Sequence, residues 1–502
     1  MKPVHTPDGR TISFAHSVTP ALVLSVLILY GLMARPLFFE QPPMPLELVF
    51  VFAAAAAIAQ LLLLGFPWNA IQGAITHRLS RAMPAIFILF AIGLIVGSWM
   101  VCGTIPMLVY WGVLVIDPSW IYVFSFVVPA LFSMLTGTSW GSAGTIGVVV
   151  MGIGVTVGAE LPIIAGAVIG GALFGDKLSP LSDTTNFAAI GADVPLFEHI
   201  RSMLWTTVPS AMIAVVLYSS VGLFLRSASP ESATSTDEFL DGLAMIFNYS
   251  GALLLPPLVV LVGSFRGWPT LPVLLASTVL ATALGLLAQP FSAAAVFESL
   301  TTGFDLAMAG DPAVPQAVSA LLERGGLYSM REAIFVAVLV FLFVGAIDLL
   351  DTMPRLVGRA FAFAHTRPAT VLAALGASAA TNAMTSNQSA TSFIVGDAFR
   401  QRFDKLKIPR RVLSRSIEDL GTMLESLVPW HPTALFMMAT LGVSVVDYWN
   451  WQFLSLANFV VAPLLAVTGI GCFHGETAAP QDPANDGLSG GTQDSQPEDG
   501  GA

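Results

Sequence analysis

Long apolar stretches separated by short polar connections cover most of the 502 residues. About 20 apolar residues in an α-helix cross a hydrocarbon core of roughly 30 Å, and about ten stretches approach or exceed that length. The pattern therefore predicts an all-α polytopic membrane protein with about ten full spans. The predicted spans are residues 18–34, 46–66, 84–116, 161–191, 202–225, 243–263, 269–289, 331–350, 416–446 and 451–471.

Two further apolar segments, 121–159 and 368–399, have polar centres. Each arm of the first segment has about 15 residues, which reach only about 22 Å at 1.5 Å per residue. Basic residues flank the second segment on both sides, whereas Asp117 and Glu160 flank the first. We therefore expect two re-entrant helical hairpins, with 121–159 opening outward and 368–399 opening inward.

Two of the predicted spans, 161–191 and 416–446, contain charged stretches, so both are predicted to be broken helices. Aligned on Asp176 and Asp419, these stretches share the pattern Asp-x-x-Ser/Thr-x-Leu. Charge and irregular backbone are costly in hydrocarbon and persist where they line a site or pack inside protein. The two stretches therefore indicate an ion pathway.

The hairpin centres also resemble one another. Residues 138–143 (Thr-Ser-Trp-Gly-Ser-Ala) match residues 385–390 (Thr-Ser-Asn-Gln-Ser-Ala) at four of six positions. Together the two pairs predict an inverted-topology repeat, in which two antiparallel copies of one helical unit surround a site in mid-membrane. The predicted organisation is a cytoplasmic N-terminus at 1–17, a first transmembrane half at 18–226, a linker at 227–242, a second transmembrane half at 243–471 and a disordered cytoplasmic tail at 472–502.

The distribution of basic residues agrees with this topology. With the N-terminus inside, most of the 21 Lys and Arg residues fall on the cytoplasmic side, as the positive-inside rule requires. We expect a multi-pass protein of the cell (inner) membrane, surrounded by the lipid bilayer, with both termini in the cytoplasm.

Composition narrows the class of function. The mean hydropathy is +0.77, and 55% of residues are hydrophobic and 11% charged, which excludes an ordinary soluble enzyme. Cys102 and Cys472 lie far apart in apolar surroundings, so neither a disulfide framework nor a metal cluster is expected. The sequence has no nucleotide-binding loop or zinc motif, and we expect no ATP-driven engine, enzyme activity, cofactor or nucleic-acid partner.

The charged stretches carry the candidate chemistry. Buried carboxylates bind a hard cation through oxygen or carry a proton, and the two ligands compete for the same lone pairs. The structural alternative is a buried Asp–Lys pair that ties helices together, and Lys177 fits a brace and a direct role equally well. Glu418, near a basic loop, is interpreted as a helix-end charge. The candidate carboxylates are Asp176, Asp183, Asp419 and Glu425.

The hairpin centres offer hydroxyls, amides and loop carbonyls that can replace the hydration shell of sodium, although small polar residues also serve helix–helix contacts in membranes. The candidate ligands are Thr138, Ser139, Thr385, Ser386, Asn387 and Ser389. His431 follows Trp430 in a predicted break and is interpreted mainly as a packed or interfacial side chain. Lys177, Glu425 and His431 are also candidates for a brace or a substrate contact. Three other histidines are assigned to basic loops: His77, His199 and His365.

Residues 175–186 (Gly-Asp-Lys-Leu-Ser-Pro-Leu-Ser-Asp-Thr-Thr-Asn) resemble the hallmark of the NhaC-type sodium/proton antiporter family, within the ion transporter superfamily. Residues 137–141 and 414–422 are also similar to it, and the resemblance extends over roughly 20–471. It implies inverted repeats with paired hairpins, frequent dimers, and ion-site roles for Asp176, Asp183, Asn186, Thr138, Ser139, Asn387 and Asp419. Sodium is expected at Asp176, Asp183 and Asn387.

The sequence departs from the family pattern at 427–431, where a histidine follows the tryptophan in place of the expected asparagine. The resemblance implies exchange of cytoplasmic sodium for external protons. The family also includes exchangers of organic acids, so the alternative is a sodium- or proton-coupled exchanger of a small carboxylate or amino acid. A channel or a receptor is disfavoured, because a repeat with broken helices suits alternating access.

Overall fold

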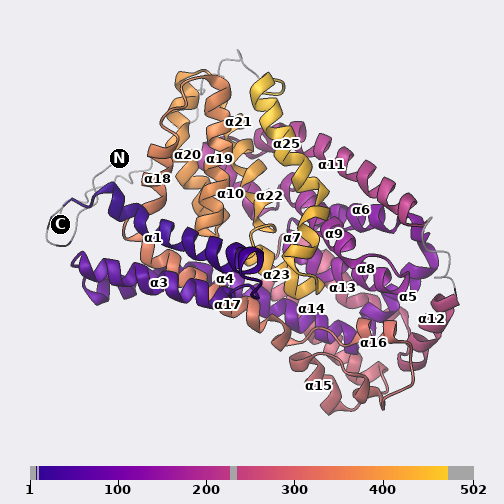
Figure 1. Cartoon of the computed structure of the whole chain (residues 1–502). Coiled ribbons are helices and arrows are strands. Elements are labelled where there is room, and N and C mark those ends of the chain that lie inside the picture. Colours follow the sequence, from indigo (N-terminus) through magenta and orange to yellow (C-terminus); the bar gives the residue numbers. More distant parts are fainter. Residues whose placement is uncertain (1–6, 8, 10, 227–233, 473–502) are drawn as a thin grey trace, which may run out of the picture.

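The structure is a computed structural model that describes residues 7, 9, 11–226 and 234–472. Within these ranges every regular element is a helix, and nine helices are long and apolar enough to cross a membrane, or up to eleven if each of two bent pairs counts as one span. The predicted all-α polytopic fold is confirmed (Figure 1). The predicted disordered tail, apart from Cys472, and the first part of the linker, 227–233, lie outside the described residues.

One group of helices forms a packed scaffold. The central helix α4 (Trp68–Val101) packs against α14 (Thr270–Ala288) and α17 (Arg331–Asp348), and α17 also packs against α3 (Leu46–Leu63). The predicted span 84–116 differs from the structure. The helix begins earlier, at Trp68, and a turn at Gly103, with φ of +88°, separates it from α5 (Thr104–Val115).

The remaining helices surround this scaffold and the broken helices. They include α1 (Phe14–Ile28), α11 (Leu196–Arg226), α12 (Thr234–Ile246), α13 (Leu255–Phe265), α15 (Ala293–Thr302), α16 (Gln316–Leu322), α18 (Thr352–Ala360), α24 (Val445–Tyr448) and α25 (Phe453–Thr468).

Two hairpins, each followed by a broken helix, contain the polar stretches. The first unit comprises η2 (Pro118–Trp120), α6 (Ile121–Thr136), α7 (Ser139–Ser142), the π-helical turn η3 (Ala143–Gly147), α8 (Val148–Thr156), α9 (Leu161–Leu178) and α10 (Asp183–Ala192). The second comprises α19 (Arg367–Thr385), α20 (Gln388–Lys405), α21 (Arg410–Leu420), α22 (Thr422–Glu425) and α23 (Pro432–Leu441). Both spans that were predicted to break do break.

The two units repeat with one constant offset along the sequence. The offset that takes Ser139, the start of the second arm in the first hairpin, to Gln388 also takes Asp183, the start of α10, to Pro432, the start of α23. The same offset links the ends of the first arms, the starts of the broken helices and the ends of the last helices. Left-handed backbone recurs at this offset too, at Gly137 and Ser386, Gly158 and Lys407, and Asp193 and Gly442.

Hydrogen bonds follow the same offset. The Ser133 hydroxyl donates to the carbonyl of Ala172, and at the equivalent positions of the second unit the Asn382 amide donates to the carbonyl of Gly421. The contacts between units are also reciprocal, because α10 packs on α20 while their counterparts, α23 and η3, pack on each other. An internal repeat is therefore present in the helix boundaries, the turns and the contacts.

The repeat corrects the alignments that the sequence suggested. Matching Asp176 with Asp419 is wrong, since the structural counterpart of Asp176 is Glu425. Matching Thr138 with Thr385 is also wrong, since Thr138 and Asn387 both cap the second hairpin arm. The short shared motifs suggested a different alignment from the one that the helix boundaries give. The two units have kept their backbone structure while their side chains have diverged.

The arms of the first hairpin are longer than the sequence suggested. They run Pro118–Thr136 and Ser139–Thr156, and each is long and apolar enough to be a candidate span. Neither arm of the second hairpin is among the candidate spans of the described residues. The re-entrant course of both hairpins stays a prediction.

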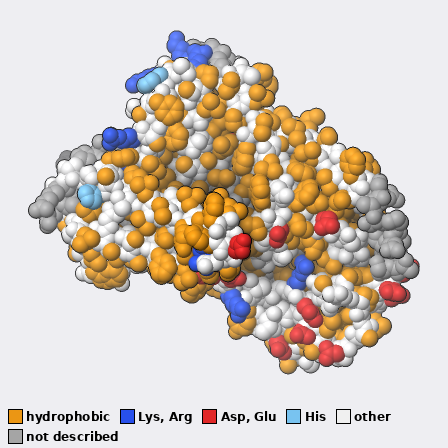
Figure 2. All heavy atoms as spheres, viewed as in Figure 1, with side chains coloured by type: hydrophobic (Ala, Val, Ile, Leu, Met, Phe, Trp, Pro, Cys, Tyr) orange, Lys and Arg blue, Asp and Glu red, His pale blue; other side chains and the backbone are white. Residues whose placement is uncertain are grey.

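Charged side chains are separated on the surface, as Figure 2 shows. Lys and Arg gather over the end of the molecule where α20 and α21 meet, and Asp and Glu gather over the end formed by α12, α15 and α16. Most of the surface between these ends is apolar. This distribution is the one expected of a protein with a lipid-facing belt between two differently charged ends.

Candidate functional site

Buried charges meet where the two broken helices are interrupted. Four carboxylates are involved, and each has at most 7% of its surface exposed: Asp176, Glu418, Asp419 and Glu425. Two buried cations accompany them, Lys177 at 1% and Arg415 at 2% exposed. If every group is ionised, the cluster carries an excess of two negative charges. Such an excess is costly in a low-dielectric interior unless bound cations or protons offset it.

Asp176 connects three elements of the first unit. It lies in the last turn of α9, and its carboxylate faces the hydroxyls of Ser139 and Ser182 and the backbone N–H of Ser139. The Thr185 hydroxyl, on α10, donates to the backbone carbonyl of Asp176 at 3.3 Å. The structure therefore brings together two residues that the sequence predicted for the site, Asp176 and the hairpin residue Ser139.

Lys177 joins the two units. Its Nζ donates to the backbone carbonyl of Glu418 at 2.7 Å, so the lysine lies beside the carboxylates of the second broken helix. The Glu418 carboxylate faces His199, with 3.6 Å between Oε2 and Nε2, and His199 Nδ1 lies 2.9 Å from the Ser414 hydroxyl.

Both Glu418 and His199 are fully buried. The interpretations of Glu418 as a helix-end charge and of His199 as a loop residue are therefore wrong. Both errors have the same cause, because proximity to basic residues in the sequence hides burial in the fold.

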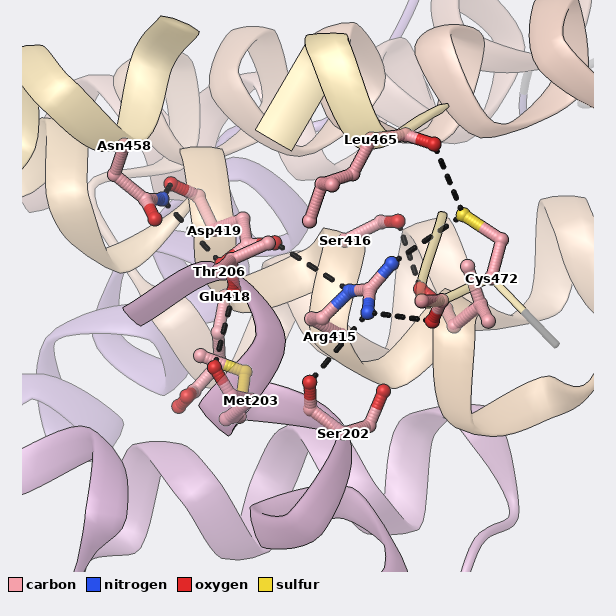
Figure 3. Close-up of polar contacts among 12 residues, drawn as sticks. Ser202, Met203, Thr206, Arg415, Ser416, Glu418, Asp419, Asn458, Leu465 and Cys472 are labelled. Atoms are coloured by element: carbon pink, nitrogen blue, oxygen red, sulfur yellow. Dashed lines mark hydrogen bonds and ion pairs between the residues drawn. The ribbon is translucent and has the colours of Figure 1, made fainter. Parts of the chain in front are cut away.

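Asp419 links three helices, α21, α11 and α25 (Figure 3). Its Oδ1 accepts hydrogen bonds from Thr206 at 2.8 Å and from Asn458 at 3.3 Å, and Asn458 also donates to its backbone carbonyl at 2.8 Å. Its Oδ2 lies 3.8 Å from Nε of Arg415, one turn earlier on α21. In this conformation Asp419 has partners on both oxygens.

Arg415 extends this network toward the end of α25. Its Nη1 donates to the Gly471 carbonyl at 3.0 Å, and its Nη2 lies 3.5 Å from the Cys472 sulfur. The guanidinium therefore holds the end of the described chain against α21 while it faces Asp419 (Figure 3). Arg415 and Asp419 together form the most extensively connected ion pair of the described interior.

Glu425 has a separate set of neutral partners. Its Oε1 accepts a hydrogen bond from the Asn382 amide at 3.1 Å, and its Oε2 accepts one from the Thr433 hydroxyl at 2.8 Å. Trp140, at the tip of the first hairpin, donates to the same Thr433 hydroxyl at 3.3 Å. His431 is only 4% exposed, so it is packed and not interfacial, and its Nε2 lies 3.4 Å from Asn382 Oδ1.

The other predicted ligands lie at the hairpin tips and in α10. Thr138 and Asn387 use their side-chain oxygens to cap backbone N–H groups of their own hairpins, at 3.3 and 2.8 Å. Asn186 donates to the Pro180 and Ser182 carbonyls, and Asp183 is exposed. Thr385 and Ser386 are buried at the second tip and Ser389 is half-buried. The sodium ligand set Asp176, Asp183 and Asn387 stays a prediction.

Several polar residues of the site were not predicted from the sequence. Asn382 and Asn458 are buried amides in apolar helices, a signal that was available in the sequence. Thr206, Thr433 and Arg78 resemble ordinary helix or loop residues. Arg78 is 8% exposed and its Nη2 donates to the Thr385 carbonyl at 3.1 Å, so the scaffold helix α4 contacts the second hairpin tip.

Comparison with known sequences identifies relatives over almost the whole chain. A chain from Haemophilus influenzae described as an uncharacterized Na(+)/H(+) antiporter is 34% identical over 474 residues, covering 94% of this chain and 99% of the relative. The Na(+)/H(+) antiporter NhaC of Alkalihalophilus pseudofirmus is 33% identical over 455 residues, covering 90% and 95%.

A more distant relative is the malate-2H(+)/Na(+)-lactate antiporter of Bacillus subtilis, 29% identical over 473 residues, covering 93% of this chain and 96% of the relative. The sequence model of the Na+/H+ antiporter family matches residues 171–470, which include the breaks of both broken helices and the second hairpin. The chain belongs to the Na+/H+ antiporter family, and its similarity to NhaC places it with the NhaC-type members.

Proposed function

We propose that the protein is a secondary antiporter that exchanges cytoplasmic sodium for external protons. The observation that carries this proposal is the buried excess of two negative charges, four carboxylates against Lys177 and Arg415. A monovalent cation or protons can offset it, and the two compete for the same carboxylate oxygens. Competition at one set of oxygens couples the two fluxes in opposite directions, provided that only the occupied site changes sides.

Asp176 is the best candidate for the exchanging carboxylate. Its carboxylate faces two serine hydroxyls and one backbone N–H, and none of these is a cation. Asp419, by contrast, faces Arg415 and accepts two side-chain hydrogen bonds, so we assign it mainly to holding α21 in place. Lys177 then supplies a fixed positive charge that limits how many cations the cluster takes up.

The internal repeat supports an alternating-access mechanism. In transporters built from inverted repeats, one element moves against another around a fixed site in mid-membrane. The hairpins and broken helices carry the site, whereas α3, α4, α14 and α17 form a packed scaffold. The membrane potential contributes about 2.3 kcal/mol per charge per 100 mV, so exchange of more than one proton per sodium ion would use it.

The orientation follows from the positive-inside rule. The end of the molecule rich in Lys and Arg, where α20 and α21 meet, is assigned to the cytoplasm of a cell membrane, with the acidic end outside (Figure 2). A homodimer, which the family resemblance implies, is part of the proposal.

The second candidate is coupled exchange of an organic acid. The relative named a malate-2H(+)/Na(+)-lactate antiporter is similar over nearly the whole chain, and it favours this alternative over any non-transport role. In this structure Lys177, the cation closest to Asp176 in sequence, already donates to Glu418, which leaves it less free to bind a substrate carboxylate.

The test uses purified protein in liposomes that contain a pH-sensitive dye. Pulses of sodium, lithium and potassium are added without organic solute. We expect a sodium-dependent proton flux that is lost in Asp176→Asn and retained in Asp397→Asn, a matched change of an exposed carboxylate on α20. A flux of wild-type size in Asp176→Asn would refute the assigned role. A flux that appears only with malate, lactate or an amino acid would establish the second candidate.

A further inference from the structure

We propose a second monovalent-cation site, in which Glu425, Asn382, Thr433 and the carbonyl of Gly421 supply the oxygen ligands. This inference rests on the proposed sodium exchange, and it adds a cation to the one expected at Asp176. The two sites occupy equivalent positions in the two repeated units. The site belongs to the second unit, whose residues 424–435 differ from the motif at 175–186 at most positions.

The repeat places Glu425 where Asp176 stands in the first unit. Pro180 and Pro429 are equivalent in the two breaks, and Ser182 and His431 are the equivalent N-caps of α10 and α23. Each carboxylate therefore lies at the same height of a broken helix and faces the start of the next helix. A carboxylate that is retained at such a position in two diverged units points to a shared role.

The surroundings of Asn382 show a concentration of oxygen acceptors. Its Nδ2 lies 3.1 Å from Oε1 of Glu425, 2.9 Å from the Gly421 carbonyl oxygen and 3.0 Å from Oε1 of Gln388. An amide NH₂ group has two protons, so it cannot satisfy three acceptors fully. The Thr433 hydroxyl adds a further oxygen, 2.8 Å from the other oxygen of Glu425. Carboxylate, carbonyl and hydroxyl oxygens grouped in this way are the ligands that hard cations prefer.

Gln388 gives a second, independent sign of a ligand. It is the first residue of α20 and only 6% exposed, yet its Nε2 has no hydrogen-bond partner among the described residues. Its amide lies against Gly421, at the first interruption of the second broken helix. A buried amide with one end bonded and the other unsatisfied is costly, and a rearrangement of the Asn382–Gln388 pair around a cation would remove that cost.

The net charge of the cluster also indicates two bound cations, one at Asp176 and one at Glu425. The cluster has an excess of two negative charges, and one sodium ion at Asp176 offsets one of them. Glu425 has no cationic partner of its own among its hydrogen bonds to the described residues, since Asn382 and Thr433 are neutral. A second monovalent cation at Glu425 completes the balance, and it would compete there with a proton.

Equilibrium binding of radioactive sodium to the purified full-length protein in nanodiscs at alkaline pH tests this site. We expect about two sodium ions per chain for the wild type, and about one for Glu425→Gln and for Asp176→Asn. The double variant should bind none, and Asp397→Asn should bind as the wild type does. Thr433→Val, which keeps the shape of the side chain, should weaken one of the two binding events severalfold, and this covers the case in which Glu425→Gln does not fold.

The outcomes separate the two proposals. One sodium ion per wild-type chain, unchanged in Glu425→Gln and lost in Asp176→Asn, overturns the second site and leaves sodium exchange intact. One ion that is lost in either variant shows a single site shared by both carboxylates, and it also overturns the proposal. Absence of sodium binding by the wild type, together with absence of flux in liposomes, rejects the exchange function itself.

Discussion

Asp176 and Glu425 occupy the same position in two repeated units, each shortly before the N-cap of the helix that follows the break. Asp176 faces serine hydroxyls and a backbone N–H, whereas Glu425 accepts hydrogen bonds from an asparagine amide and a threonine hydroxyl. The fold therefore presents two buried carboxylates that face neutral groups, and a separate charged network built on Lys177 and Arg415. We therefore expect Asp176 and Glu425 to exchange ions, and the carboxylates paired with Lys177 and Arg415 to keep their partners.

Removal of the Lys177 charge tests the charged network. Lys177→Met should destabilise the protein by about 3–5 kcal/mol, because it removes a cation from beside two buried carboxylates, Glu418 and Asp419. Thermal unfolding in detergent, followed by fluorescence, measures the effect. The double change Lys177→Met with Glu418→Gln should recover part of the lost stability, since it also removes an uncompensated charge. A double variant no more stable than the single one would show that the two residues are not coupled.

Neighbouring threonines on α11 provide a matched pair for Asp419. Thr206→Val removes the hydrogen bond from the Thr206 hydroxyl to Oδ1 of Asp419, and it should cost about 1–3 kcal/mol because a buried carboxylate loses a donor. Thr207 is equally buried, but its hydroxyl has no hydrogen-bond partner among the described residues. Thr207→Val should therefore be neutral or slightly stabilising. Equal melting temperatures for the two variants would contradict the role given to Thr206.

A surface cluster makes a pH-dependent contribution outside the membrane-spanning segments. Arg410 contacts Asp404 at 2.8 and 2.9 Å and Asp193 of the first unit at 2.5 Å, and it holds the pKa of Asp404 below its usual value of 3.8. A lowered pKa in the folded state stabilises the fold above the unfolded value, and this contribution is lost as the pH falls through the lowered pKa. Because the groups are partly exposed, it amounts to about 1 kcal/mol or less.

Asp404→Asn tests this contribution. The variant should melt slightly below the wild type at pH 7. The difference should shrink as the pH falls below about 4, because Asp404 then becomes protonated in the unfolded wild-type chain before it does so in the folded protein. Arg410→Gln should have at least as large an effect at pH 7, because it also removes the contact with Asp193. A difference between wild type and Asp404→Asn that grows on acidification would have the wrong sign for this pair.

Scaffold contacts should matter for transport as well as for stability. Arg78→Leu removes the donor to the Thr385 carbonyl, at the carboxyl end of α19, where a positive charge is stabilising by about 0.3–2 kcal/mol. We expect a lower melting temperature and a severalfold lower sodium-dependent flux in liposomes, because the second hairpin tip loses its link to α4. The exposed neighbour Arg81, changed to Leu, is the control. Equal flux in the two variants would show that the tip is positioned by other contacts.

Hydrophobic periodicity and length predicted the all-α fold, the two broken helices and the hairpin segments, because these features depend on residues close together in sequence. The register of the repeat could not be read in the same way. Asp176 and Asp419 share a short motif, but the equivalent pair is Asp176 and Glu425, and only the matching helix ends and turns reveal it. Backbone geometry is shared by the two units, whereas side chains are not.

The sequence singled out the candidate residues that are unusual in apolar helices, and it missed buried polar residues of ordinary types. Asp176 and Ser139 meet as expected. His199 and Glu418 were assigned to surface positions because basic residues surround them in the sequence, yet both are fully buried against each other. Thr206 and Thr433 acquire their roles only through packing between segments that lie far apart in the sequence, as the bond from Thr206 to Asp419 shows.

Glycine contacts between the two units give a last prediction. Gly396 of α20 lies against the backbone of Gly191 in α10, and a Cβ at Gly396 would overlap the Gly191 carbonyl oxygen. Gly396→Ala should therefore separate these helices and cost about 1–3 kcal/mol, seen as a lower melting temperature in detergent. Gly376→Ala in α19 is the matched control, because its Cβ would meet only the Phe361 ring at 3.4 Å.

In that control, helix propensity alone favours alanine by about 0.5–1 kcal/mol. Because α10 and α20 belong to different units, separation of the pair should also slow sodium-dependent exchange, while Gly376→Ala leaves it unchanged. A Gly396→Ala protein that is as stable and as active as Gly376→Ala would mean that the two units do not need this close approach. The reciprocal packing of α10 on α20 would then be a consequence of the repeat and no requirement for transport.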